Sequence, residues 1–340
     1  MSHFPVLLPA FEMLLASLHA GDRIAVIGHA RPDGDCIGSQ VALCRVLRAR
    51  GVQAVCVNTD PVPRRLAFLV GDTPFQVGRD FLPDGAKPEG WRAIFVDCAD
   101  HARPGKRLAS AFPRPLGCVD HHLSNESYAE HNVVDSAAAA TAEMLAGLFL
   151  DLRIPIDPTS AQGLYAGIAT DTGQFSFPST THRVFELTGE LIECGANPAV
   201  ASNHLYAQES FAKLELLGRF LASLRRECGG RVCVGVLRRG DFVETGATSE
   251  DTEGLVDYAR SIEGVDIGAL VEERPEGAKA SLRAKDPAMR VDQIAASFGG
   301  GGHACAAGLN VGDTVDALRT QLITAIGAHL GRVDALRGAT

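Results

Sequence analysis

An apolar run that ends in one carboxylate and two adjacent imidazoles is the segment of this sequence best suited to chemistry. Residues 116–119 read Leu-Gly-Cys-Val, and Asp120, His121 and His122 follow directly. A strand that carries these groups at its carboxyl end is typical of a metal-binding or catalytic site. Because neighbouring side chains of an extended backbone point to different sides, we expect one imidazole to bind metal and the other to face a substrate. Asp120 can orient an imidazole by accepting its second N–H. The alternative is a histidine pair in a surface loop.

Three further segments bring acidic residues to the ends of apolar elements. His29 ends one apolar run, and the turn that follows carries Asp33 and Asp35. Asp97 ends the run Ala-Ile-Phe-Val, and Asp171 ends the segment Ile-Ala-Thr. Each also has an ordinary interpretation, because Asp-Gly is a common turn and a single aspartate often forms a turn or caps a helix. A strand-terminal histidine beside carboxylates favours a site for manganese, iron or zinc.

Together these segments supply six nitrogen and oxygen donors and no thiolate. The donors are His29, Asp33, Asp35, Asp97, His121 and Asp171. Six such ligands exceed the four of a tetrahedral zinc ion, and they suit two ions about 3.5–4 Å apart that share one bridging carboxylate. Ion pairs of this kind generate hydroxide near neutral pH and stabilise the attacking and leaving oxygens of phosphoryl transfer. The pattern therefore predicts phosphoester hydrolysis.

A glycine run in the last third of the chain is a second candidate site. Gly300, Gly301 and Gly302 lie within a run of four glycines, and His303 follows. Glycines let the backbone approach a ligand closely, so that its N–H groups can hold phosphate oxygens. The alternative is a flexible linker. Arg283 lies on a nearby predicted strand, and its guanidinium fork suits phosphate; Lys285 is a weaker candidate of the same kind.

The elements that must position the first set of residues alternate between strands and helices. Strands are predicted at 24–29, 53–58, 92–97 and 116–119, and the apolar residues between 37 and 47 recur on one face of a helix. This order predicts an α/β fold, with a mostly parallel sheet and helices on both of its faces. Ligands of such sheets bind beyond the carboxyl ends of the strands, where the acidic tips are expected.

The second half of the chain predicts a smaller α/β domain. Helical patterns dominate from about residue 137 to 226. Strands are then expected at 231–237, 265–272 and 278–285, with helices at 251–262 and 315–330. We expect a catalytic metal-binding domain at 1–190, a helical linker at 191–228 and a substrate-binding domain at 229–340.

The composition is that of an ordinary globular protein with 46% hydrophobic and 21% charged residues among 340. No stretch reaches the roughly 20 apolar residues that span a bilayer, and the apolar start of the chain predicts an amphipathic helix rather than a secretory signal. Nine cysteines without a Cys-x-x-Cys pair predict reduced thiols and a cytoplasmic protein. The net charge of −9 argues against a protein that coats long nucleic acids.

Taken together, these motifs resemble the DHH phosphoesterase family, in its bacterial branch that degrades nanoRNA and dephosphorylates 3′-phosphoadenosine 5′-phosphate (pAp). Four segments match the family motifs in order along the chain. They are residues 28–35, 96–100, 119–122 and 169–175. Residues 281–283 and 299–308 resemble the C-terminal domain associated with this family. The likeness covers nearly the whole chain.

The resemblance implies two divalent ions, which we expect to be Mn²⁺, with Mg²⁺ or Co²⁺ as substitutes. One ion would be held by His29, Asp33 and Asp97; the other would be held by Asp35, Asp97, His121 and Asp171. Asp97 would bridge the two ions, and Asp97, Asp120, His121 and His122 would form the catalytic group. Arg103, Arg283, His303 and the glycines 300–302 would bind the substrate. A homodimer is a further expectation.

The sequence departs from the family in one place. Ala304 and Cys305 follow His303, where relatives often carry a basic or polar residue. We expect this difference to affect phosphate anchoring and substrate preference rather than the metal site. The predicted activity is hydrolysis of short oligoribonucleotides, of pAp, or of both. The alternatives are a phosphodiesterase for cyclic or linear dinucleotides and a non-catalytic nucleotide-binding regulator.

Overall fold

The computed structural model of the protein describes residues 2–337, and the chain forms two compact units. The units are Met1–Gln208 and Glu209–Thr340. Helix α8 (Pro198–Tyr206) belongs to the first unit and helix α9 (Phe211–Ser223) to the second. The region predicted as a linker therefore contributes a helix to each unit.

The first unit is built on a six-stranded sheet in the order β3-β2-β1-β4-β5-β6. Its strands are β1 (Arg23–Ile27), β2 (Gln53–Asn58), β3 (Phe75–Val77), β4 (Trp91–Val96), β5 (Gly117–Asp120) and β6 (His131–Val134). Neighbouring strands all pair in parallel, which confirms the predicted kind of sheet. The short strands β3 and β6 were not predicted.

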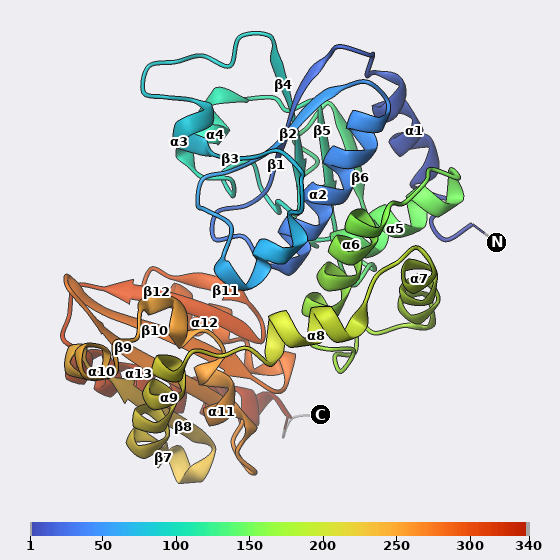
Figure 1. The fold of residues 1–340 in the computed structure, drawn as a ribbon. Coiled ribbons are helices and arrows are strands. Elements are labelled where there is room, and N and C mark those ends of the chain that lie inside the picture. The colour runs from blue at the N-terminus through green and yellow to red at the C-terminus, as the bar shows by residue number, and fades with distance from the viewer. Residues whose placement is uncertain (1, 338–340) are drawn as a thin grey trace. The chain divides into compact units, whose positions relative to one another are not determined.

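Helices cover both faces of this sheet, as expected (Figure 1). One face packs against α1 (Leu8–Ala16), α2 (Gly34–Ala49), α5 (Thr141–Asp151) and α6 (Pro158–Asp171). The other packs against α3 (Gly78–Phe81) and α4 (Lys106–Ala111). Side chains alternate along β1, so Val26 joins the first core and Ile27 the second. Helix α7 (His182–Glu193) adds Val184 and Leu187 to the first core.

The second unit has a mixed six-stranded sheet in the order β11-β12-β10-β9-β8-β7. Its strands are β7 (Arg225–Glu227), β8 (Val232–Leu237), β9 (Ile267–Arg274), β10 (Gly277–Ala284), β11 (Gly301–His303) and β12 (Ala306–Val311). Strands β8 and β9 pair in parallel, and the remaining neighbours pair antiparallel. The glycine run thus enters a strand, so the flexible-linker interpretation is wrong.

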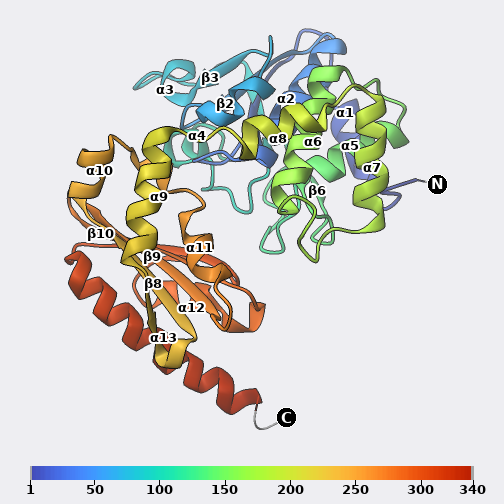
Figure 2. The same ribbon diagram turned by 60° about the horizontal axis from the view of Figure 1, so that its bottom comes forward.

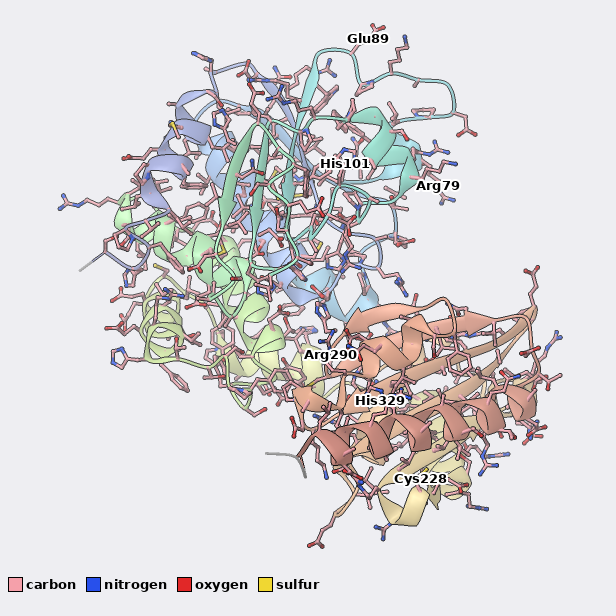
Figure 3. The ribbon with its side chains drawn as sticks, turned by 180° about the vertical axis from the view of Figure 1, so that it is seen from behind. Arg79, Glu89, His101, Cys228, Arg290 and His329 are labelled. Atoms are coloured by element: carbon pink, nitrogen blue, oxygen red, sulfur yellow. The ribbon has the colours of Figure 1, made fainter. Side chains whose placement is uncertain are left out.

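Helices also cover both faces of the second sheet. One face packs against α12 (Val291–Ala296) and the long α13 (Val315–Arg337), which Figure 2 shows running beside β8 and β9. In Figure 3, His329 is labelled on α13. The other face packs against α9, α10 (Arg239–Thr245) and α11 (Leu255–Ser261). The helix predicted at 251–262 is shorter than expected, because a 3-10 turn at Ser249–Thr252 precedes α11.

Within residues 2–337, none of the helices combines the length and apolar character that a bilayer crossing requires.

Candidate metal centre

The turn after β1 separates the roles of its two aspartates. Asp33 is the N-cap of α2, and its side chain accepts the N–H of Cys36 at 3.1 Å. Asp35 lies in the first turn of α2 and is fully buried. It accepts the backbone N–H groups of Thr141 and Ala142, each at 2.7 Å, at the start of α5. The interpretation of Asp35 as the helix cap is therefore wrong, and its carboxylate is held in place by a second helix.

Glycines at the contact between α2 and α6 bring Asp171 toward Asp35. A Cβ atom on Gly38 would lie 2.1 Å from the carbonyl oxygen of Gly163, and one on Gly167 would lie 2.9 Å from Asp35 Oδ1. Only glycine permits so close an approach of the two backbones. Asp171 is the last residue of α6, where the helix dipole disfavours a negative charge. A bound cation would offset this unfavourable interaction, so a role as a metal ligand suits Asp171 better than a role as a helix cap.

Asp97 follows β4 in an unusual backbone conformation. Its φ angle is +56°, in the left-handed region that aspartate tolerates better than most side chains. Its N–H donates to the carbonyl of Val119 at 3.0 Å, and its side chain is buried. The next carbonyl, that of Cys98, accepts the Tyr128 hydroxyl at 2.8 Å. These bonds fix the loop that turns the Asp97 carboxylate toward the carboxyl ends of the strands.

The two oxygens of Asp97 face two different imidazoles. Oδ2 lies 3.3 Å from Nε2 of His29, which also lies 3.6 Å from Asp33 Oδ2. Oδ1 lies 3.6 Å from Nε2 of His121. The structure thus places the Asp97 carboxylate between His29 and His121.

His121 Nε2 lies among three carboxylates from three different parts of the chain. The distances are 3.4 Å to Asp171 Oδ2, 3.6 Å to Asp97 Oδ1 and 3.8 Å to Asp35 Oδ2. Its other ring nitrogen, Nδ1, lies 3.4 Å from the carbonyl of Ala138. All six predicted donors are therefore drawn together at one end of the first sheet.

Asp120 orients His122, the second imidazole of the opening triplet. Asp120 Oδ1 lies 2.8 Å from His122 Nδ1, and Oδ2 accepts the Asn125 amide N–H at 2.7 Å. Asp120 is fully buried, so both bonds form away from water. His122 Nδ1 also lies 3.6 Å from Asp97 Oδ1, which puts this ring beside the cluster. The bond to Asp120 favours a proton on Nδ1 in the neutral ring.

The charges of the cluster shift the protonation of its members. Burial opposes the charged form of His29, but hydrogen bonds to Asp33 and Asp97 outweigh it and raise its pKa to about 11. Burial and the nearby carboxylates raise the pKa of Asp35 and of Asp171 well above the usual range. For Asp97, burial works against ionisation, yet the bond to His29 and the neighbouring imidazoles lower its pKa. Several carboxylates thus compete for few positive partners, a conflict that bound cations would resolve.

The donors form three compact groups, in each of which the ligand atoms lie within 4.8 Å of one another. The groups are His29–Cys36–Asp97, Asp97–His121–His122 and Asp35–His121–Asp171. Mixed imidazole and carboxylate donors fit manganese and similar divalent ions. Cys36, which follows Asp35 and is buried, was not among the predicted donors. Nothing in its spacing marked it as a neighbour of the site.

The predicted substrate-binding residues fall in both units. In the first, the backbone carbonyl of Arg103 accepts the N–H of Ala30 at 2.8 Å, and the Arg103 charge opposes protonation of His122. Arg103 thus lies close enough to the cluster to influence it.

In the second unit, Arg283 and His303 both pair with Ala306, so they lie in one row across β10, β12 and β11. Gly300 and Gly302 contact β12 so closely that a Cβ atom would lie 2.3 Å and 2.4 Å from backbone oxygens, whereas Gly301 has open space. Tight packing accounts for two of the three glycines.

Comparison with known proteins agrees with this architecture. The DHH family, N-terminal domain, matches residues 23–168, and the DHHA1 domain matches residues 229–328. The bifunctional oligoribonuclease and PAP phosphatase NrnA of Thermus thermophilus is 31% identical over 310 residues, which cover 91% of this chain and 90% of that protein. The protein of the same name from Bacillus subtilis is 25% identical and covers 93% of this chain and 98% of its own.

Among solved structures, an exopolyphosphatase-related protein from Bacteroides fragilis has the same fold. The TM-score is 0.88 at 22% identity, over 96% of this chain and 97% of that one. A parallel sheet with acids and imidazoles at its strand ends, joined to a glycine-rich mixed sheet, defines a two-domain phosphoesterase. The chain belongs to the DHH phosphoesterase family and carries its associated DHHA1 domain, as the motifs predicted.

Proposed function

We propose that this protein is a metal-dependent hydrolase that cleaves short oligoribonucleotides and removes a phosphate from pAp. The observation that carries the proposal is the position of His121 Nε2, within 3.8 Å of carboxylates from α2, α6 and the loop after β4. The relatives named as oligoribonuclease and PAP phosphatase match over nine-tenths of the chain, which supports this choice of substrates.

We further propose two divalent ions, with Mn²⁺ as the first candidate. His29, Asp33 and Asp97 would hold one, and Asp35, Asp97, His121 and Asp171 the other. When bound, such ions lower the pKa of water and stabilise charge on the phosphate oxygens. Asp97 is suited to the shared position because each of its oxygens faces a different histidine.

Side chains around the donors would position the substrate. His122, with Nδ1 bonded to Asp120, would deliver a proton from Nε2 to the leaving oxygen. Burial opposes its protonation, but the bond to Asp120 and the charge of Asp97 raise its pKa, which favours a role as an acid. Arg103 would bind a phosphate beside the ions. In the second unit, Arg283 and His303 would bind another phosphate group of the substrate.

The proposed substrates are short because few local cations serve to hold them. The chain carries a formal charge of −9, so a long polyanion gains little from the remaining surface. We propose that the protein acts in the cytoplasm. We also propose that it forms a homodimer, which light scattering of the purified protein would test.

The direct test is turnover by the full-length protein with Mn²⁺. The substrates would be a short RNA, pAp, and linear and cyclic dinucleotides. Release of mononucleotides from RNA and of phosphate from pAp is expected, with loss of both after chelation. Preference for a cyclic dinucleotide would replace the proposed substrate with the dinucleotide alternative. No turnover of any of these compounds would refute the proposal.

A further inference from the structure

The chain continues from the candidate metal centre into a tight turn. Asp171 is the last residue of α6, and residues 172–181 connect this helix with α7 (Figure 1). The Asp171 carboxylate lies 3.4 Å from the ring of His121, which directly follows β5. Helix α6 therefore ends beyond the carboxyl ends of the strands, where ligands of parallel sheets bind. The turn starts on the side of the sheet that a substrate would approach.

The turn has an unusual backbone that hydrogen bonds hold in place. Gly173, Gln174 and Phe175 have φ angles of +55°, +57° and +63°, so three successive residues adopt left-handed conformations. Only the first is a glycine, and a Cβ atom makes this conformation unfavourable at the other two. The buried Thr172 accepts the N–H of Phe175 with Oγ1 at 3.1 Å and the N–H of Phe177 with its carbonyl at 2.9 Å. Conformations of this kind are concentrated at functional sites.

The two phenylalanines of the turn have different surroundings. Phe175 packs against the first core, where its ring lies 6.2 Å from that of Tyr165 and stacks on that of Phe185 at 5.6 Å. Phe177 lies on the backbone of the turn, since a Cβ atom on Gly173 would come within 2.4 Å of its ring. Phe177 is nevertheless 45% exposed. Packing in the core thus explains Phe175, whereas Phe177 leaves a large apolar surface in water.

The exposed ring of Phe177 is close to the metal donors. Gly173, on which the ring lies, is two positions after Asp171, and two Cα–Cα steps span at most about 7.6 Å. A base is joined to its phosphate through a single ribose. One nucleotide can therefore place its phosphate at the donors and its base at this ring.

We propose that Phe177 stacks on a base of the substrate while the adjoining phosphate lies at the metal centre. The inference rests on the function proposed above and adds a residue that determines specificity. Aromatic side chains bind the unpaired bases of single-stranded RNA by stacking, and every base offers a π face. Phe177 would therefore favour nucleotides over phosphate esters without a base, and it would do so without reading the RNA sequence.

Calorimetry of the full-length protein with Mn²⁺ measures this contact without turnover. AMP, the expected product of pAp, is compared with ribose 5-phosphate, which has the same sugar and phosphate and no base. The wild type should bind AMP about tenfold more tightly than ribose 5-phosphate. Phe177→Ala should remove this difference by weakening AMP binding alone, an effect of the size expected for a lost stacking ring. Phe177→Trp should retain the preference for AMP.

Ile192→Ala is the matched control. Ile192 is a large apolar residue of the same unit with a similar exposure of 43%. It lies near the C-terminal end of α7, roughly 15 Å from the start of that helix. Its replacement removes about as much exposed apolar surface, and the affinities for AMP and ribose 5-phosphate should both stay unchanged.

Equal AMP affinities of the wild type and Phe177→Ala would overturn the proposal, as would a wild type that does not prefer AMP to ribose 5-phosphate. A parallel loss of both ligands in Phe177→Ala would do the same, because it would indicate damage to the phosphate site. Hydrolysis of pAp and short RNA by the wild type is measured separately. Turnover combined with an AMP affinity that does not depend on Phe177 refutes the stacking alone. AMP binding through Phe177 without turnover of any substrate refutes the proposed activity alone.

Discussion

Replacing Asp120 with asparagine tests how the structure controls His122. Asp120 is fully buried and uses both oxygens, one for His122 Nδ1 at 2.8 Å and one for the Asn125 amide at 2.7 Å. An asparagine can keep only one of these acceptors. If its oxygen stays with Asn125, its NH₂ group faces His122 Nδ1, and the ring proton must move to Nε2. If it turns over, two N–H donors face each other at Asn125.

The expected effect is a loss of rate without a loss of fold. Partners that orient an imidazole beside a metal are typically worth 10–100-fold, or about 1.4–2.8 kcal/mol in the barrier. The pKa of His122 should also fall, because its bond to Asp120 helps to raise it. If the protonated ring acts as the acid, activity is present below this pKa and is lost as the pH rises through it. The high-pH limb of the rate profile should therefore move to lower pH in Asp120→Asn.

The assay is the pH dependence of kcat and kcat/KM for pAp and a short RNA, with Mn²⁺ saturating. Asp100→Asn is the control, because Asp100 is exposed and its carboxylate accepts the nearby N–H of Ala102 rather than an imidazole. The control should behave as the wild type does. Rates within twofold of the wild type and an unmoved high-pH limb in Asp120→Asn would refute the role given to His122.

Four further results are expected. Asp97→Ala should abolish turnover of every substrate, since it removes the carboxylate shared by both proposed ions; near-normal rates would exclude the two-metal site. Asp171→Asn should raise the Tm of the chelated protein at pH 8 by roughly 2–4 °C and reduce the further rise caused by Mn²⁺. The raised pKa of Asp171 means that its ionised form costs stability above its ordinary pKa, so this difference should shrink toward pH 4. Mn²⁺ binding near pH 7 should release protons, because His29, with a pKa of about 11, must lose one to bind metal. The Mn²⁺ affinity should rise about tenfold per pH unit for each proton released. Calorimetry in buffers of different ionisation enthalpy measures the release, and finding no released proton would contradict this prediction. His303→Ala should raise KM for pAp far more than it changes the affinity for Mn²⁺, and the reverse pattern would contradict its place in substrate binding.

The sequence predicted the parts of the site that depend on local order along the chain. Apolar runs that stop at a histidine or an aspartate predicted His29, Asp97 and the Asp120 triplet at the carboxyl ends of parallel strands, and the structure places them there. Cys36 and Thr141 could not be predicted as neighbours of these donors. Thr141 donates to Asp35 across 106 positions of the chain, and only the packing of helices makes that contact.

The two short edge strands escaped prediction for a similar reason. Phe75–Val77 and His131–Val134 are too brief for an alternating pattern and form through pairing with β2 and β5. The glycine run shows the opposite case. Its composition favoured a ligand-binding loop over a linker, and only the contacts with β12 show that Gly300 and Gly302 satisfy packing.

The glycine contact between α2 and α6 sets the spacing of two carboxylates from positions that carry no functional group. Gly38 lies about one turn along α2 from Asp35, and Gly163 lies about two turns along α6 from Asp171. A methyl group on Gly38 would lie 2.1 Å from the Gly163 carbonyl oxygen, so it would push the helices apart and increase the distance between those acids. Selection for metal affinity would then act on residues that never meet an ion. The absence of side chains at Gly38 and Gly163 thus contributes to the geometry of the metal centre as much as the presence of its donors.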